Sequence, residues 1–284
     1  MENKRILVIG GFGYIGREIV TRLIAEKYEV TVLSRNSRKN AQVNPIRFIK
    51  GSVLDKKFLA SKVKGFDIVI YLAAIVQSVN KSRYRENARG VENIVDAMHL
   101  NKTKKIIYFS TQNVHISKTG PYGNSKKQCE RIILNSDLDY MVIRPNYVYG
   151  IDKQNNFYKL RNIIRKIRIC PIIGKGNNKI QPINKKDIGD MTVDFVKEFS
   201  SGSIIDISGK TAISVSDVAD YIEEHEGRGF IRVHVPIRLL KLFKNIIPFD
   251  VDGFAIDRIS PLEDNSYKIS SNIWDDLDDI FRLK

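Results

Sequence analysis

Tyr122 and Lys126 stand four positions apart in the run Pro121–Lys126. Side chains with this spacing share one face of a helix, so we expect the phenol and the amine to lie close together. A phenol that exchanges protons near neutral pH needs its pKa lowered from about 10 to about 7, which takes about 4 kcal/mol. An ammonium about 4 Å away supplies about that much at an effective dielectric constant of about 20. The pair suits a general acid/base tuned by a cation; the alternative is two surface residues of a helix.

A glycine-rich loop follows the first apolar run of the chain, at residues 5–9. Gly10, Gly13 and Gly16 are spaced by two residues each, with Tyr14 and Ile15 between the last two. Between a strand and a helix, such glycines allow a tight turn, close backbone approach to a pyrophosphate, and helix–strand packing. The free N–H groups and the helix dipole then favour an anion. The loop predicts dinucleotide binding; the alternative is a tight turn without a ligand.

The end of the second apolar run predicts which dinucleotide is preferred. About 20 residues beyond such a loop, a carboxylate normally accepts hydrogen bonds from the adenosine ribose 2′-OH. This chain has Ser34 and Arg35 there, with Arg38 just beyond. A guanidinium cannot accept a hydrogen bond, but it pairs with a 2′-phosphate through two. We therefore expect NADP(H) to be favoured over NAD(H); the alternative is that these cations are only solvated loop charges.

The elements that must position these residues alternate between strands and helices. We expect strands over 5–9, 29–33, 46–49, 67–72, 105–110 and 140–144, and helices over 17–26 and 87–100. Parallel strands need crossover helices, so the fold class is α/β, a Rossmann-type doubly wound parallel sheet. Residues 1–150 form the expected NAD(P)-binding domain. Residues 151–284 form a smaller, partly discontinuous C-terminal α/β substrate lobe, with segments that return to the first domain.

The composition of the chain narrows the class of protein further. The chain has 284 residues, 43% of them hydrophobic, and a formal net charge of +15. Cys129 and Cys170 are too few for a disulfide scaffold, and the four histidines show no metal-ligand spacing, so no metal is expected. With no apolar run long enough to span a membrane and no signal-peptide pattern, a cytoplasmic protein is expected. The charge favours anionic ligands; nucleic-acid binding has only net charge in its favour and is not expected.

Six segments together resemble the short-chain dehydrogenase/reductase superfamily, in its extended NAD(P)-dependent epimerase/dehydratase branch. They are GGFGYIG (10–16), YLAA (71–74), ENARGVEN (86–93), YFST (108–111), PYGNSK (121–126) and RPNYVYG (144–150). The resemblance implies that Tyr122 is the general acid/base, that Lys126 tunes it and binds the nicotinamide ribose, and that Thr111 holds the substrate oxygen. It also implies further cofactor contacts at Ser52, Val53, Leu72, Ala73, Ala74, Asn87 and Pro145.

Two departures from the family pattern bear on the reaction. Thr111 is followed by Gln112 and Asn113, where sugar-nucleotide 4,6-dehydratases use an Asp–Glu pair. An amide cannot exchange a proton as a carboxylate does, so dehydration is disfavoured. Ser52 stands where the family usually has an adenine-contacting Asp, which leaves adenine recognition open.

The expected activity is that of an NADP-dependent oxidoreductase or epimerase acting on a keto or hydroxyl group of a nucleotide sugar. Net reduction is favoured, because NADP suits a reductant that is released at each turnover. The alternative is a non-catalytic dinucleotide-binding sensor or accessory subunit, for which an acid/base tyrosine would have no use.

Two expectations concern partners. The resemblance implies a homodimer joined through helices 87–100 and 125–134, with apolar contacts from Val91, Val95, Met98, Ile132 and Ile133. Residues 236–247 combine an apolar face with Arg238, Lys241 and Lys244. Peripheral contact of this segment with a membrane surface is one interpretation, and packing on the lobe core is the favoured one.

Overall fold

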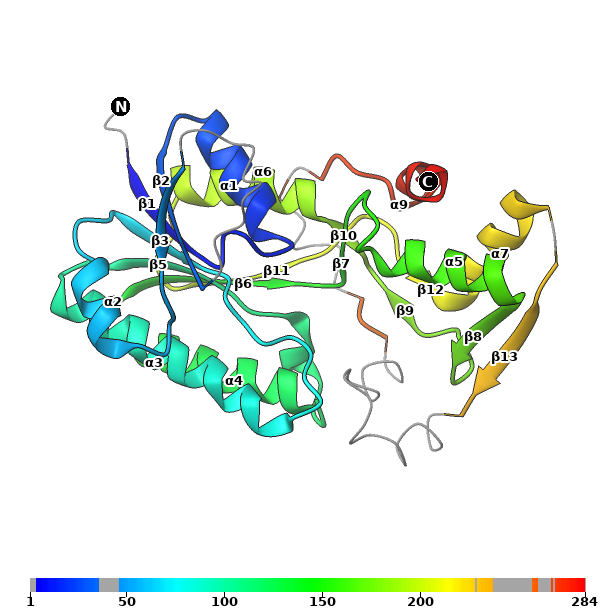
Figure 1. Cartoon of the computed structure of the whole chain (residues 1–284), viewed down its shortest axis with the longest axis horizontal. Helices are drawn as coiled ribbons and strands as arrows, with labels where there is room; N and C mark the ends of the chain where they lie inside the picture. The colour runs from blue at the N-terminus through cyan, green and yellow to red at the C-terminus, as the bar shows by residue number, and fades with distance from the viewer. Residues whose placement is uncertain are drawn as a thin grey trace.

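A seven-stranded parallel sheet forms the centre of the protein, in the order β11-β6-β5-β4-β1-β2-β3 (Figure 1). The structure is a computed structural model that describes residues 4–35, 46–227, 229–236, 257–259, 267 and 269–283. Its central strands are continuous apolar runs buried on both faces, as parallel strands covered by helices must be. The predicted doubly wound α/β class is confirmed. The strands are β1 (Arg5–Ile9), β2 (Glu29–Ser34), β3 (Arg47–Lys50), β4 (Ile68–Tyr71), β5 (Lys105–Phe109), β6 (Asp139–Pro145) and β11 (Ser203–Ile207).

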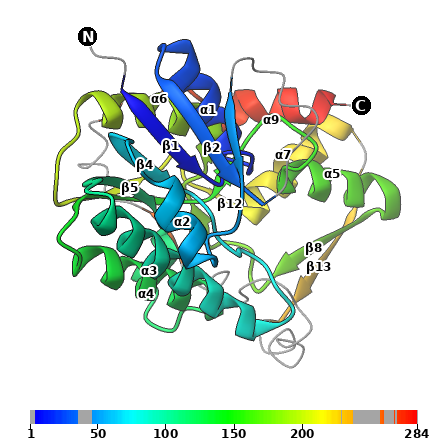
Figure 2. The ribbon, with the colours of Figure 1, turned by 60° about the vertical axis from the view of Figure 1, so that its left-hand side comes forward.

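Helices cover both faces of this sheet (Figure 2). On one face α1 (Gly16–Ala25) packs against α6 (Lys185–Lys197), and their apolar side chains join one core cluster. On the other face lie α2 (Lys56–Lys62), α3 (Arg85–Leu100) and α4 (Pro121–Leu134), which share a second cluster. Two short 3₁₀ helices, η1 (Lys81–Tyr84) and η2 (Gln112–His115), precede α3 and α4. Because α6 and β11 come after residue 150, both halves of the chain build this unit.

The remaining C-terminal elements form a smaller lobe with a core of its own. Its helices are α5 (Asn156–Ile167), α7 (Val215–Glu226) and α9 (Ile273–Arg282). Strand β8 (Ile169–Ile173) pairs in parallel with β13 (Ile231–Val235), and two-residue strands add three cross-links between distant parts of the chain. The pairs are β7 (Val148–Tyr149) with β10 (Ile183–Asn184), and β9 (Lys179–Ile180) with β12 (Ile213–Ser214), while Arg258 bridges to Ile180.

Most of the side chains predicted to line a dimer seam are buried inside a single chain. Four of the five are buried against the sheet within one chain, because the apolar stripe of each helix faces the core. They are Val91, Val95, Met98 and Ile133. The exposed face of α3 carries charged residues instead, Arg89, Glu92 and Asp96 among them. This assignment of the seam is wrong, and the homodimer stays a prediction.

Residues 236–247, for which packing on the lobe core was favoured over contact with a membrane surface, lie outside the described residues except for Pro236. None of the described helices has both the length and the apolar character needed to cross a bilayer.

Candidate functional site

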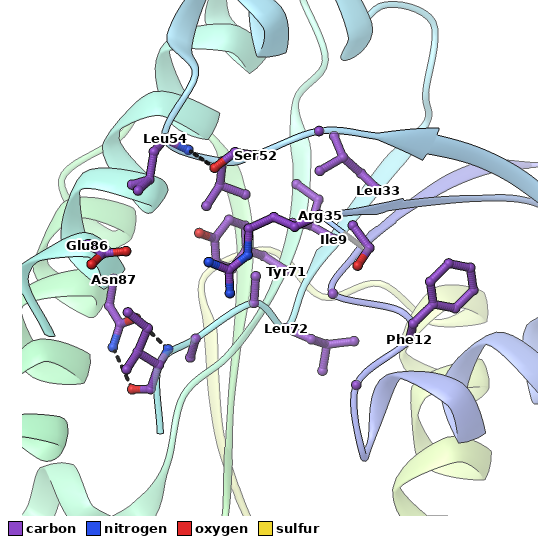
Figure 3. A pocket seen from close by; sticks show the side chains of 18 residues that line it. Ile9, Phe12, Leu33, Arg35, Ser52, Leu54, Tyr71, Leu72, Glu86 and Asn87 are labelled. Carbon is purple, nitrogen blue, oxygen red and sulfur yellow. Dashed lines mark hydrogen bonds between the residues drawn. The ribbon is translucent and has the colours of Figure 1, made fainter. Parts of the chain in front are cut away.

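A cavity of about 290 Å³ opens at the carboxyl edge of the sheet, where open α/β sheets bind ligands (Figure 3). Its walls come from the glycine loop after β1, from the end of β2, and from segments 51–54 and 71–75. Glu86 and Asn87, at the start of α3, close one side. Ten of the predicted cofactor residues line it: Gly10, Gly13, Ser34, Arg35, Ser52, Val53, Leu72, Ala73, Ala74 and Asn87.

The glycine loop has the geometry that its sequence requires. Gly10 has φ +84°, and a Cβ there would lie 2.9 Å from the backbone nitrogen of Ala73. A Cβ on Gly16 would lie 2.5 Å from the carbonyl oxygen of Gly10, inside the turn. Both positions therefore exclude any side chain, and α1 begins directly at Gly16. The loop keeps its backbone close to the cavity, as a pyrophosphate cradle needs.

Arg35 is an exposed side chain at the rim of the cavity, one residue beyond the end of β2 (Figure 3). Ser52 accepts a hydrogen bond from the backbone N–H of Leu54 at 3.2 Å, so its hydroxyl shapes the adjacent turn. The nearby acid, Asp55, caps α2 by accepting from Phe58 N at 3.0 Å and is not part of the cavity wall. Arg38 lies outside the described residues. Arg35 is thus the cation that the described part of the cavity wall presents.

Asn87 connects the cavity to α4. Its side chain accepts from Ile75 N at 2.7 Å, and its amide donates to Ile75 O at 3.1 Å and to Ser125 Oγ at 3.0 Å. The Ser125 hydroxyl donates in turn to the backbone oxygen of Tyr122 at 2.7 Å. This chain of hydrogen bonds fixes the start of α4 relative to the segment after β4.

Lys126 is 3% exposed and bonds to strand β5. Its amine donates to Phe109 O at 2.5 Å and to the hydroxyl of Tyr108 at 3.1 Å, and it lies 4.6 Å from the centre of the Tyr108 ring. Burial lowers the pKa of Lys126 to about 8, against smaller opposing effects from Cys129 and Glu130. The amine therefore lies at the carboxyl end of β5, beside Phe109, which precedes Thr111 by two positions in the sequence.

Tyr122 is half-buried, and its ring lies 6.5 Å from that of Tyr84. Burial raises the pKa of the Tyr122 phenol well above its usual range. The expectation that Lys126 lowers this pKa is not met in the chain alone, because that amine is bound to Tyr108 and Phe109. The i, i+4 spacing places both residues on one helix face, but it does not choose between hydrogen-bond acceptors. Thr111 caps η2 by accepting from Asn113 N at 3.3 Å.

The two amides that follow Thr111 bind other parts of the chain. Gln112 is 6% exposed; it donates to Ser208 Oγ at 2.9 Å and accepts from Asn146 Nδ2 at 2.7 Å. Asn113 accepts from the guanidinium of Arg258 at 2.9 Å. Both side chains tie η2 to segments that precede or belong to the lobe.

Besides Tyr122 and Lys126, four predicted cofactor residues within the described ranges lie outside the cavity wall. The Tyr14 ring lies 4.7 Å from the Lys185 amine, near Asp152, which pairs with Lys185 at 2.7 Å. Pro145 is buried at the end of β6, paired with Ile207. Tyr14, Ile15, Gly16 and Pro145 are the four.

Several residues of the cavity wall were missed in the sequence. Some lie within the matched segments 10–16 and 86–93, and others directly follow predicted positions, so their only signal was their place in the sequence. They include Phe12, Leu54, Ile75 and Glu86.

Metal binding gains no support here. Within the described ranges, no three His, Cys, Asp or Glu side chains gather as a metal site would require. Cys129 and Cys170 are both buried and unpaired with each other.

A parallel sheet with a glycine loop after its first strand, and a cavity at the carboxyl edge beside it, defines a dinucleotide-binding protein of the Rossmann class. A family model described as NAD(P)H-binding matches residues 10–167, more than half of the chain. The chain belongs to this NAD(P)-binding family, in the extended short-chain dehydrogenase/reductase, epimerase/dehydratase branch.

Three similar proteins illustrate the range of this family. The N-acetyl-alpha-D-glucosaminyl-diphospho-ditrans,octacis-undecaprenol 4-epimerase of Escherichia coli O157:H7 is 23% identical, over 95% of this chain and 84% of its own. The photosystem II assembly factor Ycf39 of Cyanophora paradoxa is 25% identical, over 90% of this chain and 79% of its own. The UDP-glucose 4-epimerase of Bifidobacterium longum, solved with NAD+ and UDP, has a TM-score of 0.79 at 19% identity, covering 98% of this chain and 97% of its own.

Proposed function

We propose that the protein is an NADP-dependent oxidoreductase or epimerase that acts on a keto or hydroxyl group of a sugar attached to a diphosphate. One observation carries the proposal: the dinucleotide-type cavity is lined by segment 71–75 at the end of β4, and β4 pairs with β5, at whose end Thr111 and the Lys126 amine lie. Bound NADP(H) would supply or accept a hydride. The chain's own residues would hold the cofactor, orient the sugar and move one proton.

The proton would pass through Tyr122. Burial keeps the pKa of this phenol high, so in the chain alone it is protonated at neutral pH. A protonated phenol can donate to the oxygen of a keto group, which is the proton transfer that reduction needs. Thr111 would hold the same oxygen by a hydrogen bond. Net reduction is the favoured direction because NADP(H) suits a reductant that is released at each turnover.

The preference for NADP(H) would come from Arg35. It lies at the rim of the cavity just beyond β2, at the position where a carboxylate would otherwise select NAD(H). Its guanidinium is exposed and would be available to a 2′-phosphate. The acid on the cavity wall, Glu86, stands at the start of α3, and Asp55 caps α2. Arg38 is a second candidate from the sequence alone.

The sugar's carrier has two candidates. The relative in E. coli is named for a sugar on diphospho-undecaprenol, and the neighbour in B. longum was solved with UDP. Both carriers present a diphosphate, which suits a basic chain of net charge +15. A nucleotide sugar is the carrier that the sequence resemblance favours.

Replacing Arg35 by Ala tests the cofactor assignment. We expect wild type to bind NADPH more tightly than NADH, and the variant to lose NADPH affinity by roughly 10- to 100-fold, since a charge-assisted hydrogen bond is worth about 1.5–3 kcal/mol. NADH affinity should change little. Arg47→Ala is the matched control, because Arg47 is exposed on β3 and pairs with Glu29 at 3.5 Å. Equal affinities of wild type for the two nucleotides would overturn the assignment.

Replacing Tyr122 by Phe tests the chemistry. Turnover of UDP-glucose or UDP-N-acetylglucosamine, followed by product analysis, should fall by at least about 100-fold, the usual worth of a general acid/base. NADPH affinity should stay nearly intact. Tyr140→Phe is the control, because Tyr140 pairs with Ile106 near the amino ends of their strands, at the opposite edge of the sheet. An unchanged rate in Tyr122→Phe would remove the proposed role.

A non-catalytic dinucleotide-binding protein is the second candidate. Two observations favour it: a relative named as an assembly factor spans 90% of this chain, and the Lys126 amine binds Tyr108 and Phe109 instead of Tyr122. Tight NADPH binding by wild type with no turnover of any sugar diphosphate would decide for this candidate.

A further inference from the structure

The two parallel strands β8 and β13 form a ribbon at the far end of the lobe from the sheet (Figure 1). We call this pair the β8–β13 ribbon. In its register Ile169 pairs with Ile231, Pro171 with Val233, and Ile173 with Val235. Because side chains alternate along a strand, these positions share one face, and the residues between them share the other.

The inner face of the ribbon is packed on the lobe. Cys170 and Ile172 are fully buried in the lobe core. The guanidinium of Arg232 bonds to Asp220 and Glu223, both on α7, at 2.5 Å each. The inner face is therefore held by α7, which leaves the other face turned away from this helix.

Every residue of the outer face is apolar. Ile231 is 67% exposed and Val233 is 41% exposed, and Ile167, just before the strand, is 53% exposed. Isolated exposed apolar residues are ordinary, but here the register aligns Ile231 and Val233 with the other apolar residues of one ribbon face, and such a surface is typical of an interaction site. The outer face consists of Ile169, Pro171, Ile173, Ile231, Val233 and Val235.

Cations flank this apolar face. Exposed lysines stand near both ends of β8, Lys166 in the last turn of α5 and Lys175 after the strand. An apolar surface bordered by lysines matches the interface of a bilayer that contains anionic lipids, where apolar side chains enter the acyl boundary and cations meet head groups. Of the two sugar carriers considered above, the polyprenyl diphosphate is held in such a bilayer.

We propose that the outer face of the β8–β13 ribbon docks on an anionic lipid bilayer. The reason for docking rests on the proposed function with the second of its two carriers, since a bilayer presents a sugar on a lipid diphosphate. The contact is peripheral. It holds the lobe against the surface while the dinucleotide cavity remains on the Rossmann unit.

Co-sedimentation of the full chain with vesicles of phosphatidylethanolamine and phosphatidylglycerol tests this surface. Wild type should pellet with the vesicles, less so at high salt. The double variant Ile231→Ser, Val233→Ser should bind at least about tenfold more weakly, because both side chains lose apolar area that the bilayer would cover. Ile204→Ser is the matched control: Ile204 is 39% exposed on β11, the edge strand of the main sheet.

Thermal unfolding and NADPH titration of each variant show whether it is folded. Wild type that stays in the supernatant, or a folded double variant that pellets like wild type, would overturn the proposal; in the second case the contact lies elsewhere, for example in 236–247. Equal loss in Ile204→Ser would also overturn it. A smaller sedimentation mass of the double variant without vesicles would assign the face to a second copy of the chain. Vesicle binding that persists in a protein without turnover would count against the proposed function alone.

Discussion

Replacing Lys126 by Met should remove a pH dependence from the stability of this protein. Burial lowers the pKa of the Lys126 amine from its ordinary 10.5 to about 8. Between these two pH values the unfolded chain keeps its proton while the folded chain has released it. Raising the pH therefore favours the folded state, which binds fewer protons. Below about pH 8 both states are protonated, and the cost of burying the charge is constant.

The magnitude follows from this pKa difference. At about 1.4 kcal/mol for each pH unit, the whole interval is worth about 3 kcal/mol, and the part between pH 8 and pH 9.5 about 2 kcal/mol. Methionine has a similar length and is a good helix former, but it does not titrate. The substitution also removes the hydrogen bonds to Phe109 and Tyr108, but that loss shifts stability by the same amount at every pH.

Urea unfolding at several pH values between 7 and 9.5 measures the effect. The difference in unfolding free energy between wild type and Lys126→Met should grow by about 2 kcal/mol in favour of wild type over this range. Cys129 and Glu130, which act on Lys126 from its own helix, remain in both proteins and largely cancel in the difference. Parallel curves for the two proteins would show that the amine is not held in a dry site, and the reasoning would fail.

Two further substitutions test the packing around the site. Gly16→Ala places a Cβ 2.5 Å from a backbone oxygen and should destabilise the protein by about 2 kcal/mol in urea unfolding. Gly229→Ala, where the nearest neighbour of the new Cβ is 3.6 Å away, should change the unfolding free energy little. Equal effects of the two substitutions would contradict the close packing of the loop. Glu130→Ala removes the carboxylate that binds the guanidinium of Arg144 through two hydrogen bonds of 2.9 and 2.7 Å. This substitution should lower the unfolding free energy by about 3 kcal/mol in the same assay. Asp279→Ala, in an exposed pair at 3.9 Å, should cost less than about 0.5 kcal/mol, and a similar loss in both variants would count against this account.

The sheet could be predicted because its strands are continuous apolar runs separated by turn residues. The expected strand over 5–9 matches β1 (Arg5–Ile9), and that over 29–33 lies within β2 (Glu29–Ser34). The helix α9 (Ile273–Arg282) was missed, although Ile273, Leu277 and Ile280 have helical spacing and are buried. The acidic residues between its apolar positions complete an amphipathic pattern, so the helical signal was present. Its partner surface in the lobe includes Tyr221, 53 positions before Trp274, and the local pattern does not give that contact.

The residue types of the candidate site could be predicted, but their hydrogen-bond partners could not. The spacing of Tyr122 and Lys126 indicates a shared helix face, and both lie on α4. How deeply that face is buried depends on how α4 packs against the sheet. This depth brings the Lys126 amine to the carbonyl of Phe109, and no local rule contains that contact. The apolar residues predicted for a dimer seam failed for the same reason, since periodicity finds an apolar stripe but not its partner.

The hydrogen bonds of Gln112 bear on the prediction that dehydration is disfavoured. In the dehydratases of the family, the residues after the threonine are acids that take part in eliminating water. Here Gln112 is buried and bound to Ser208 and Asn146, and Asn113 is bound to Arg258. Both side chains therefore cross-link the chain, and they leave the site with one hydroxyl, one phenol and one amine. Hydride transfer needs a single proton exchanged at one oxygen, which a phenol can perform. Elimination needs a second acid/base at a neighbouring carbon, and the two positions that follow Thr111 hold amides, so dehydration stays disfavoured as a prediction.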